Sequence, residues 1–128
     1  MQIHQSAEDY LETILMLNQR MGRVRSIDVV NELGYTKASV SIAMKKLREN
    51  GYIAVDGEGN LTLLEPGLEI AQRIYSRHRL LTHFFVQLGV DEQTAAEDAC
   101  KAEHILSEQT LEKIREYALL HDAQDSVK

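Results

Sequence analysis

Three glycines divide the first fifty residues into segments whose apolar side chains recur at three- and four-residue intervals, the period of an α-helix. Ser6 and Thr36 stand where N-caps are expected, and glycine is a common residue just beyond a helix C-terminus. The expected helices span residues 7–21, 26–33 and 36–50, followed by Gly22, Gly34 and Gly51. Two short helices joined through a glycine are the pattern of a helix-turn-helix.

A short β-hairpin is expected next, because the β-prone runs at residues 52–55 and 61–64 are separated by the turn-forming sequence DGEGN. Helix, helix-turn-helix and hairpin, in this order, predict a winged-helix DNA-binding domain. We assign it to residues 1–65 and a second, helical domain to residues 66–128. The fold class is therefore mainly α.

The second domain is expected to contain three helices. Pro66 fits the first turn of a long helix that continues to Gly89, and Asp91 is placed to cap a helix over residues 91–106. Ser107 is placed to cap a last helix that ends near Leu120, before a polar tail.

Charge is distributed unevenly along the chain. The net charge is -6, but residues 20–51 hold seven basic and three acidic side chains, a local charge of +4. This asymmetry favours a basic contact surface on an acidic body, and a nucleic acid as its partner.

The helix at residues 36–50 is the expected recognition helix. Val40, Met44 and Leu47 should face inward, leaving the polar side chains to face double-stranded DNA. The candidate DNA contacts, on phosphates and base edges, are Thr36, Lys37, Ser39, Ser41, Lys45 and Lys46.

Six side chains on three expected helices are competent to bind a metal. Cys100, Glu103 and His104 follow each other at i, i+3 and i+4, so a continuous helix would present a thiolate, a carboxylate and an imidazole on one face. Asp9 and Glu12 lie three residues apart on the first helix. The sixth candidate, His78, lies on the long helix. Taken singly, such residues are more often packed or solvated side chains; their joint placement indicates a metal site.

The composition argues against other classes of protein. A single cysteine makes no internal disulfide, and the sequence has no long apolar run or secretion signal, so we expect a cytoplasmic protein that does not enter a membrane. No nucleophile-elbow or zincin motif is present, and we expect no enzymatic activity.

Four blocks of the sequence resemble the diphtheria toxin repressor and manganese transport regulator family. They are residues 6–12 (SAEDYLE), the helix-turn-helix, residues 77–81 (RHRLL) and residues 100–107 (CKAEHILS). The resemblance covers nearly the whole chain and is to the short form without an SH3-like domain. It implies a homodimeric, metal-activated repressor of metal-uptake or homeostasis genes, with a helical dimerisation and metal-binding domain after the winged helix.

The ligand set that the resemblance implies is a hybrid. The manganese-type ligand positions are Asp9, Glu12, His78, Glu103 and His104. Cys100 stands where the manganese branch has glutamate and the iron branch has cysteine. The iron branch's second site is not expected in its usual form, because this chain has Ala96 and Thr82 at two of its positions.

Either Fe²⁺ or Mn²⁺ is therefore expected as the corepressor. The thiolate favours Fe²⁺ and the oxygen ligands suit Mn²⁺, with Co²⁺ or Zn²⁺ as possible substitutes. The operator should be palindromic, to match a two-fold dimer. The candidates for the dimer contact are Phe84, Phe85, Leu88, Leu111, Ile114 and Leu119. The sequence leaves two alternatives open, namely a metal-independent winged-helix regulator that senses a small molecule or a protein, and a small metal-storage or metalloenzyme-like protein.

Overall fold

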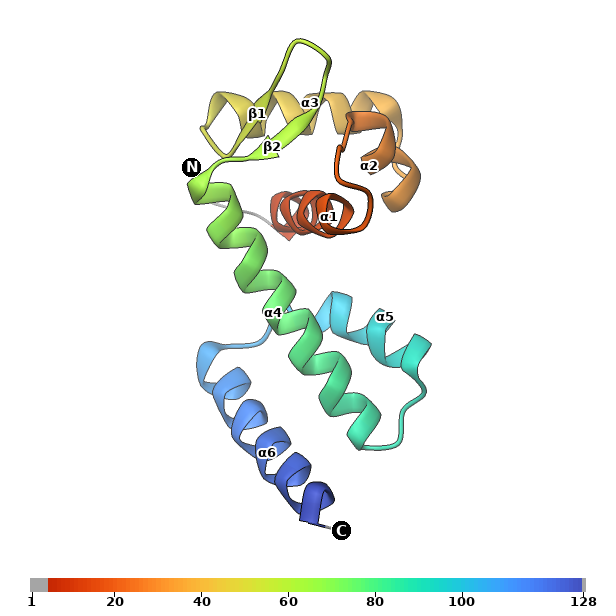
Figure 1. Ribbon diagram of the computed structural model, residues 1–128, viewed down its shortest axis with the longest axis vertical. Coiled ribbons are helices and arrows are strands. Elements are labelled where there is room, and N and C mark those ends of the chain that lie inside the picture. The colour runs from red at the N-terminus through yellow and green to blue at the C-terminus, as the bar shows by residue number, and fades with distance from the viewer. Residues whose placement is uncertain (1–4, 128) are drawn as a thin grey trace. The chain divides into compact units, whose positions relative to one another are not determined.

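The structure, a computed structural model, describes residues 5–127, and their side chains over residues 6–122. The chain forms two compact units, Met1–Arg73 and Ile74–Lys128, and helix α4 passes from the first into the second. The elements, labelled in Figure 1, are α1 (Gln5–Met21), α2 (Ser26–Leu33), α3 (Lys37–Glu49), β1 (Ile53–Val55), β2 (Leu61–Leu63), α4 (Glu65–Gln87), α5 (Glu92–Ala102) and α6 (Glu108–Val127).

The first unit is a winged helix, as predicted. Helix α1 contacts α2, α3 and β2, and α3 also contacts α2 and β1. The two strands are antiparallel, with Ile53 opposite Leu63 and Val55 opposite Leu61. Apolar side chains from the three helices, the loop before α2 and both strands fill the core between them. The most deeply buried are Leu11, Ile14, Leu17, Val24, Val29, Val40, Leu47 and Ile53.

Local signals fix the turn between α2 and α3. Gly34 has a φ of 71°, in the left-handed region that favours glycine, and its N–H donates to the Val30 carbonyl. The Thr36 hydroxyl oxygen then accepts a hydrogen bond of 3.1 Å from the N–H of Ser39, which caps α3. The sequence prediction of this helix-turn-helix is therefore confirmed.

The wing is a two-stranded hairpin with an aspartate-stabilised turn. The Asp56 carboxylate accepts hydrogen bonds of 2.9 Å from the N–H groups of Glu58 and Asn60. The bonds from Asn60 hold the pKa of Asp56 below its ordinary value. Both strands are one residue shorter than predicted, since Tyr52 and Leu64 lie outside the ladder.

The second unit has its own apolar core, made by α4, α5 and α6. Leu81, Ala99 and Leu111 are buried at its centre. Helices α5 and α6 begin at the predicted caps, because Asp91 accepts from the N–H of Thr94 and Ser107 from that of Thr110. Leu111 is thus a core residue and not a dimer contact, which corrects one of the six candidates.

Helices α3 and α4 differ from the predicted bounds by only one or two residues, and three other boundaries differ for a physical reason. Ser6 lies inside α1 and does not cap it. It is in the first turn, where the backbone N–H groups have no carbonyl partner within the helix, so a serine is tolerated there as well as at the cap. Helix α5 ends at Ala102, four residues before the expected end, since the chain turns at Glu103. Helix α6 continues beyond Leu120 to Val127, because its last residues include no proline or glycine to stop it.

The helices were also compared in length and polarity with membrane-spanning helices. Among residues 5–127, no helix combines the length and the apolar character needed to cross a lipid bilayer.

Candidate metal centre and nucleic-acid interface

Glu103 is the centre of a polar cluster in the second unit. It is the C-cap of α5, with φ -59° and ψ -23°, and its N–H donates to the Ala99 carbonyl. Its side chain is fully buried, one of few charged side chains in that position among the described residues. Burial of a carboxylate is costly unless it is hydrogen-bonded, paired with a cation or bound to a metal.

Two histidines lie close to the Glu103 carboxylate, each next to a different carboxylate oxygen. His78 Nδ1, on α4, lies 3.1 Å from Oε2, and His104 Nε2, on the turn after α5, lies 3.4 Å from Oε1. The His104 side chain is 1% exposed and that of His78 20%. A buried carboxylate and two imidazoles therefore lie together, on residues that the sequence picked out as metal ligands.

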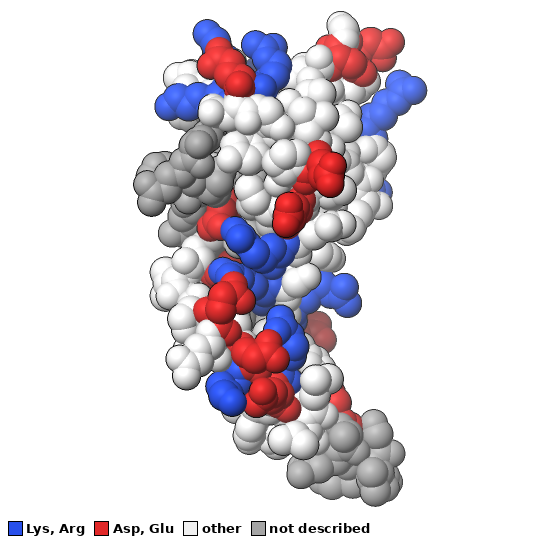
Figure 2. All heavy atoms as spheres, turned by 90° about the vertical axis from the view of Figure 1, so that its left-hand side faces the viewer, with Lys and Arg blue, Asp and Glu red and all other residues white. Residues whose placement is uncertain are grey.

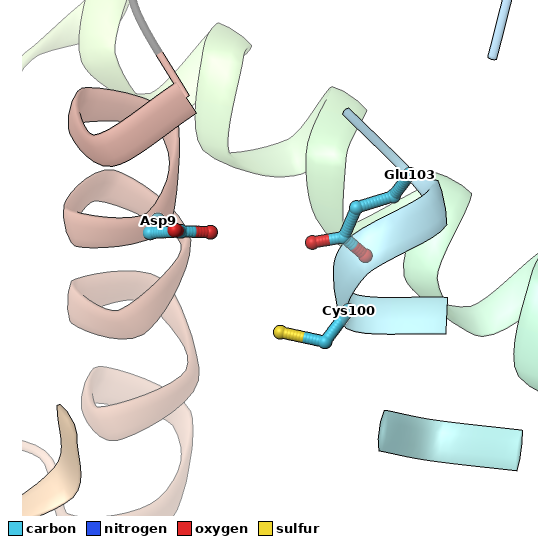
Figure 3. Close-up of side chains that lie close together, drawn as sticks. All are labelled: Asp9, Cys100 and Glu103. Atoms are coloured by element: carbon cyan, nitrogen blue, oxygen red, sulfur yellow. The ribbon is translucent and has the colours of Figure 1, made fainter. Parts of the chain in front are cut away.

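The Cys100 thiol belongs to the same region. Its Sγ lies within 4.8 Å of a carboxylate oxygen of Glu103, and Cys100 is exposed. Figure 3 shows both side chains projecting to the same side of the end of α5. Because α5 ends between these two residues, Cys100 is on the helix while Glu103 and His104 are on the turn, which corrects the expectation of one continuous helical face.

Arg77 holds this turn in place, a role that sequence reasoning missed. Its Nη1 donates a hydrogen bond of 3.2 Å to the Glu103 carbonyl, and its Nη2 contacts the carboxylate of Glu108 at the start of α6. The side chain is only 15% exposed. The only signal in the sequence is a basic residue next to His78, which is too weak to identify this role.

The remaining two candidates, Asp9 and Glu12, belong to α1 in the other compact unit. Asp9 is half-buried and extends sideways from the helix, as Figure 3 shows. Glu12 is buried, at 5% exposure. Tyr10 lies between these two acids in the sequence, and its pKa is raised by burial first, and then by Coulombic interaction with Tyr35 and Asp9.

The donors found in the second unit suit a transition metal. One carboxylate, two imidazoles and a thiol are the ligand types that Fe²⁺, Co²⁺ and Zn²⁺ accept, and the carboxylate and imidazoles also suit Mn²⁺. A buried acid that already faces two histidine nitrogens is chemically consistent with a cation site. The residues present therefore fit the metal that the sequence predicts.

Helix α3 presents the candidate DNA contacts. Val40, Met44 and Leu47 are buried as predicted, whereas Ser41, Lys45 and the other four candidates are exposed. Thr36 and Ser39 also serve the helix cap, because the Thr36 hydroxyl donates to the Ser39 hydroxyl at 2.9 Å.

The lysines of α3 keep their positive charge available. None of Lys37, Lys45 and Lys46 forms an ion pair with another described residue, while Arg20 is paired with Glu32 at 2.8 Å. Figure 2 shows one face of the molecule, on which many basic and acidic side chains lie next to each other. The lysines of α3 are therefore available for an anionic partner.

Comparison with known proteins assigns both halves of the sequence. The iron-dependent repressor N-terminal DNA-binding domain matches residues 2–61, and the iron-dependent repressor metal-binding and dimerisation domain matches residues 64–120. An uncharacterised helix-turn-helix transcriptional regulator of Methanocaldococcus jannaschii is 37% identical over 113 residues, which are 87% of this chain and 90% of that protein. The transcriptional regulator MntR of Bacillus subtilis is 32% identical over 96% of this chain and 87% of its own.

Solved structures share the fold. A manganese-dependent transcriptional repressor in complex with manganese matches 88% of this chain and 52% of its own, with a TM-score of 0.80 and 27% identity. IdeR of T. acidophilum also has a TM-score of 0.80, at 22% identity over 91% of this chain and 55% of its own, and supports the fold alone. The chain thus spans about half the length of these solved proteins.

Proposed function

The chain belongs to the iron-dependent repressor family of metal-dependent, DNA-binding transcriptional regulators, and we propose that Fe²⁺ or Mn²⁺ is its corepressor at metal-uptake or homeostasis genes. The observation that carries this proposal is the buried Glu103 carboxylate between the nitrogens of His78 and His104. A bound divalent cation would supply positive charge that offsets the cost of burying this acid.

The proposed ligands come from both compact units. His78, Cys100, Glu103 and His104 supply nitrogen, sulfur and oxygen donors from the second unit, and Asp9 and Glu12 supply carboxylates from the first. Helix α1, which carries these two acids, also contacts α2 and α3. A metal bound by Asp9 and Glu12 would therefore restrict the motion of the helix-turn-helix through α1.

This coupling gives a mechanism for regulation. A two-fold dimer can place its recognition helices in successive major grooves of a palindromic operator only when they stand about 34 Å apart. Restricting α1 in each subunit raises the fraction of dimers with that spacing, and the apparent affinity for the operator rises in proportion. Leu88 and Leu119, which are exposed, fit the proposed dimer contact better than buried Leu111.

The donor set favours Fe²⁺ first and Mn²⁺ second. The Cys100 thiolate is a softer ligand than the glutamate it replaces, which raises affinity for Fe²⁺, Co²⁺ and Zn²⁺ relative to Mn²⁺. Zn²⁺ also binds such donors tightly, so metal availability in the cytoplasm contributes to selection.

An anaerobic Co²⁺ titration followed by optical absorption tests the metal site. We expect a saturable thiolate-to-metal charge-transfer band that is lost in Cys100→Ser and kept in Asp98→Asn, which changes an exposed carboxylate on the same helix. Weak d–d bands alone would indicate an oxygen and nitrogen site and favour Mn²⁺. No Co²⁺ binding would refute the metal-dependent function and favour a metal-independent regulator.

The DNA surface is tested by the salt dependence of operator binding. We propose that Lys45 and Lys46 contact phosphates, with Lys37, Ser39, Ser41 and Thr36 at phosphates and base edges. Replacing Lys45 by alanine should reduce the slope of log affinity against log salt by about one phosphate contact. Lys113→Ala, in α6 where the lysine pairs with Glu116, is the matched control and should leave the slope unchanged.

A further inference from the structure

An isoleucine occupies the centre of the outward face of α3. Ile42 is 59% exposed, one of the most exposed large apolar side chains of the first unit. Val40, Met44 and Leu47 mark the buried face of the helix, and the helical period places Ile42 on the opposite side. An apolar side chain at this position has no role in the core of its own unit.

The surroundings of Ile42 leave its side chain uncovered among the described residues. It lines a groove of about 280 Å³ between α1 and α3, together with Ser39 and Lys46 of the same helix. One turn earlier, Ala38 has only a methyl group. Helical side chains lean toward the N-terminus, so Ile42 extends over the surface beside Ala38, in the first two turns of the helix.

The charge around this apolar group matches one kind of partner. Lys45 and Lys46 lie one turn further along α3 and are exposed, and the segment 20–51 carries a charge of +4. A protein partner with an apolar pocket would gain nothing from this charge unless it were also acidic. The major groove of DNA combines a polyanionic rim with one apolar group on its floor, the 5-methyl of thymine.

We propose that Ile42 is a specificity-determining residue that contacts a thymine methyl group in each half of the operator. This inference rests on the proposed function, since it requires that the N-terminal turns of α3 enter the major groove. Isoleucine has no hydrogen-bonding group, so it distinguishes thymine from cytosine only by contact with the methyl. The operator should therefore contain at least one thymine per half-site that is selected through its methyl alone.

Uracil substitution tests this contact directly. Duplexes are first selected from a random pool by the full-length, Mn²⁺-loaded protein, and each thymine of the selected sequence is then replaced by deoxyuridine, which lacks the methyl but pairs identically. Fluorescence anisotropy gives the affinity for each duplex. At one thymine per half-site we expect about a fourfold loss, the value for burial of one methyl-sized group.

Two variants identify the protein side of the contact. Ile42→Ala should bind the thymine and uracil duplexes equally at that position. Ile27→Ala, which removes an isoleucine of 43% exposure from α2, should keep the fourfold preference. Selection of a specific sequence with no methyl dependence at any thymine would overturn this inference and leave the proposed function intact. Failure to select any sequence, with Mn²⁺ or with Fe²⁺, would overturn both.

Discussion

The guanidinium of Arg77 donates a hydrogen bond of 3.2 Å to the backbone carbonyl of Glu103 and contacts the Glu108 carboxylate with its other terminal nitrogen. In a continuing α-helix that carbonyl would accept from the N–H four residues later. Arg77 takes this place, so α5 ends and the chain turns toward α6. One side chain of α4 thereby sets the position of the turn that carries Glu103 and His104.

Replacement of Arg77 should weaken metal binding although Arg77 is not a ligand. Arg77→Ala removes both contacts, and we expect a loss of metal affinity of about tenfold, the lower end of the range for groups that orient ligands. Arg77→Lys should lose less, since a lysine keeps the charge but reaches one acceptor instead of two. Competition with a chelator for Mn²⁺ and Co²⁺ measures these affinities.

Arg115→Ala is the matched control for Arg77. Arg115 is an exposed arginine of α6 that forms an ion pair of 2.6 Å with Glu112, away from the turn. An equal decrease of metal affinity in Arg77→Ala and Arg115→Ala would mean that Arg77 acts only through the overall charge of the protein, and not by positioning the turn.

Glu103→Gln should remove most of the stabilisation that metal gives to the protein. The amide keeps the volume of the side chain but loses the charge, and we expect metal affinity to fall by at least about a hundredfold, more than is typical of groups outside the coordination shell. With metal at about one hundred times the wild-type Kd, binding stabilises by about 2.7 kcal/mol, a shift that calorimetry detects as a change in Tm. Glu97→Gln, an exposed acid of α5, should keep the full shift. Retention of the shift in Glu103→Gln would remove this residue from the site.

The sequence predicted those parts of the fold that depend on neighbouring residues. The α2–α3 turn follows from Gly34 and Thr36, which act on backbone groups within four residues. The predicted end of α5 was wrong, because the apolar pattern in the sequence continues past Glu103. The helix ends where Arg77 contacts Glu103, and these residues are 26 positions apart in the sequence, so a local pattern does not reveal their contact. The candidate ligands Cys100, Glu103 and His104 were found from their chemistry, and their division between helix and turn came only from the structure.

A second long-range contact concerns Gly67 in the first turn of α4. A Cβ at this position would overlap the carbonyl oxygen of Tyr52 and approach Leu11 Cδ2 at 3.3 Å. We expect Gly67→Ala to lower the free energy of unfolding by about 1–3 kcal/mol, the usual cost of overpacking. Gly57→Ala, in the wing where an added Cβ meets no atom within 4 Å, should change it little. Urea unfolding of both variants gives the comparison, and equal stabilities would show that the hairpin and α4 separate without cost.

Acid should weaken the start of α5 through the N-cap Asp91. Hydrogen bonds from the backbone N–H and the hydroxyl of Thr94 lower the pKa of the Asp91 carboxyl below its ordinary value. A carboxyl with a lowered folded-state pKa stabilises the protein above its unfolded-state pKa, and this contribution is lost as pH falls through the folded value. The wild type should therefore lose this part of its stability below about pH 4.

Asp91→Asn isolates this contribution, because asparagine is an equally good N-cap and does not titrate. The difference in unfolding free energy between wild type and variant, measured in urea without metal, should favour the wild type near neutral pH, where its carboxylate also interacts with the helix dipole. The difference should decrease or change sign as pH falls through the folded pKa of Asp91, since the protonated carboxyl is the weaker hydrogen-bond acceptor. A difference that stays constant with pH would mean that Asp91 acts only through its shape, and that the acid sensitivity of the protein arises at other carboxylates.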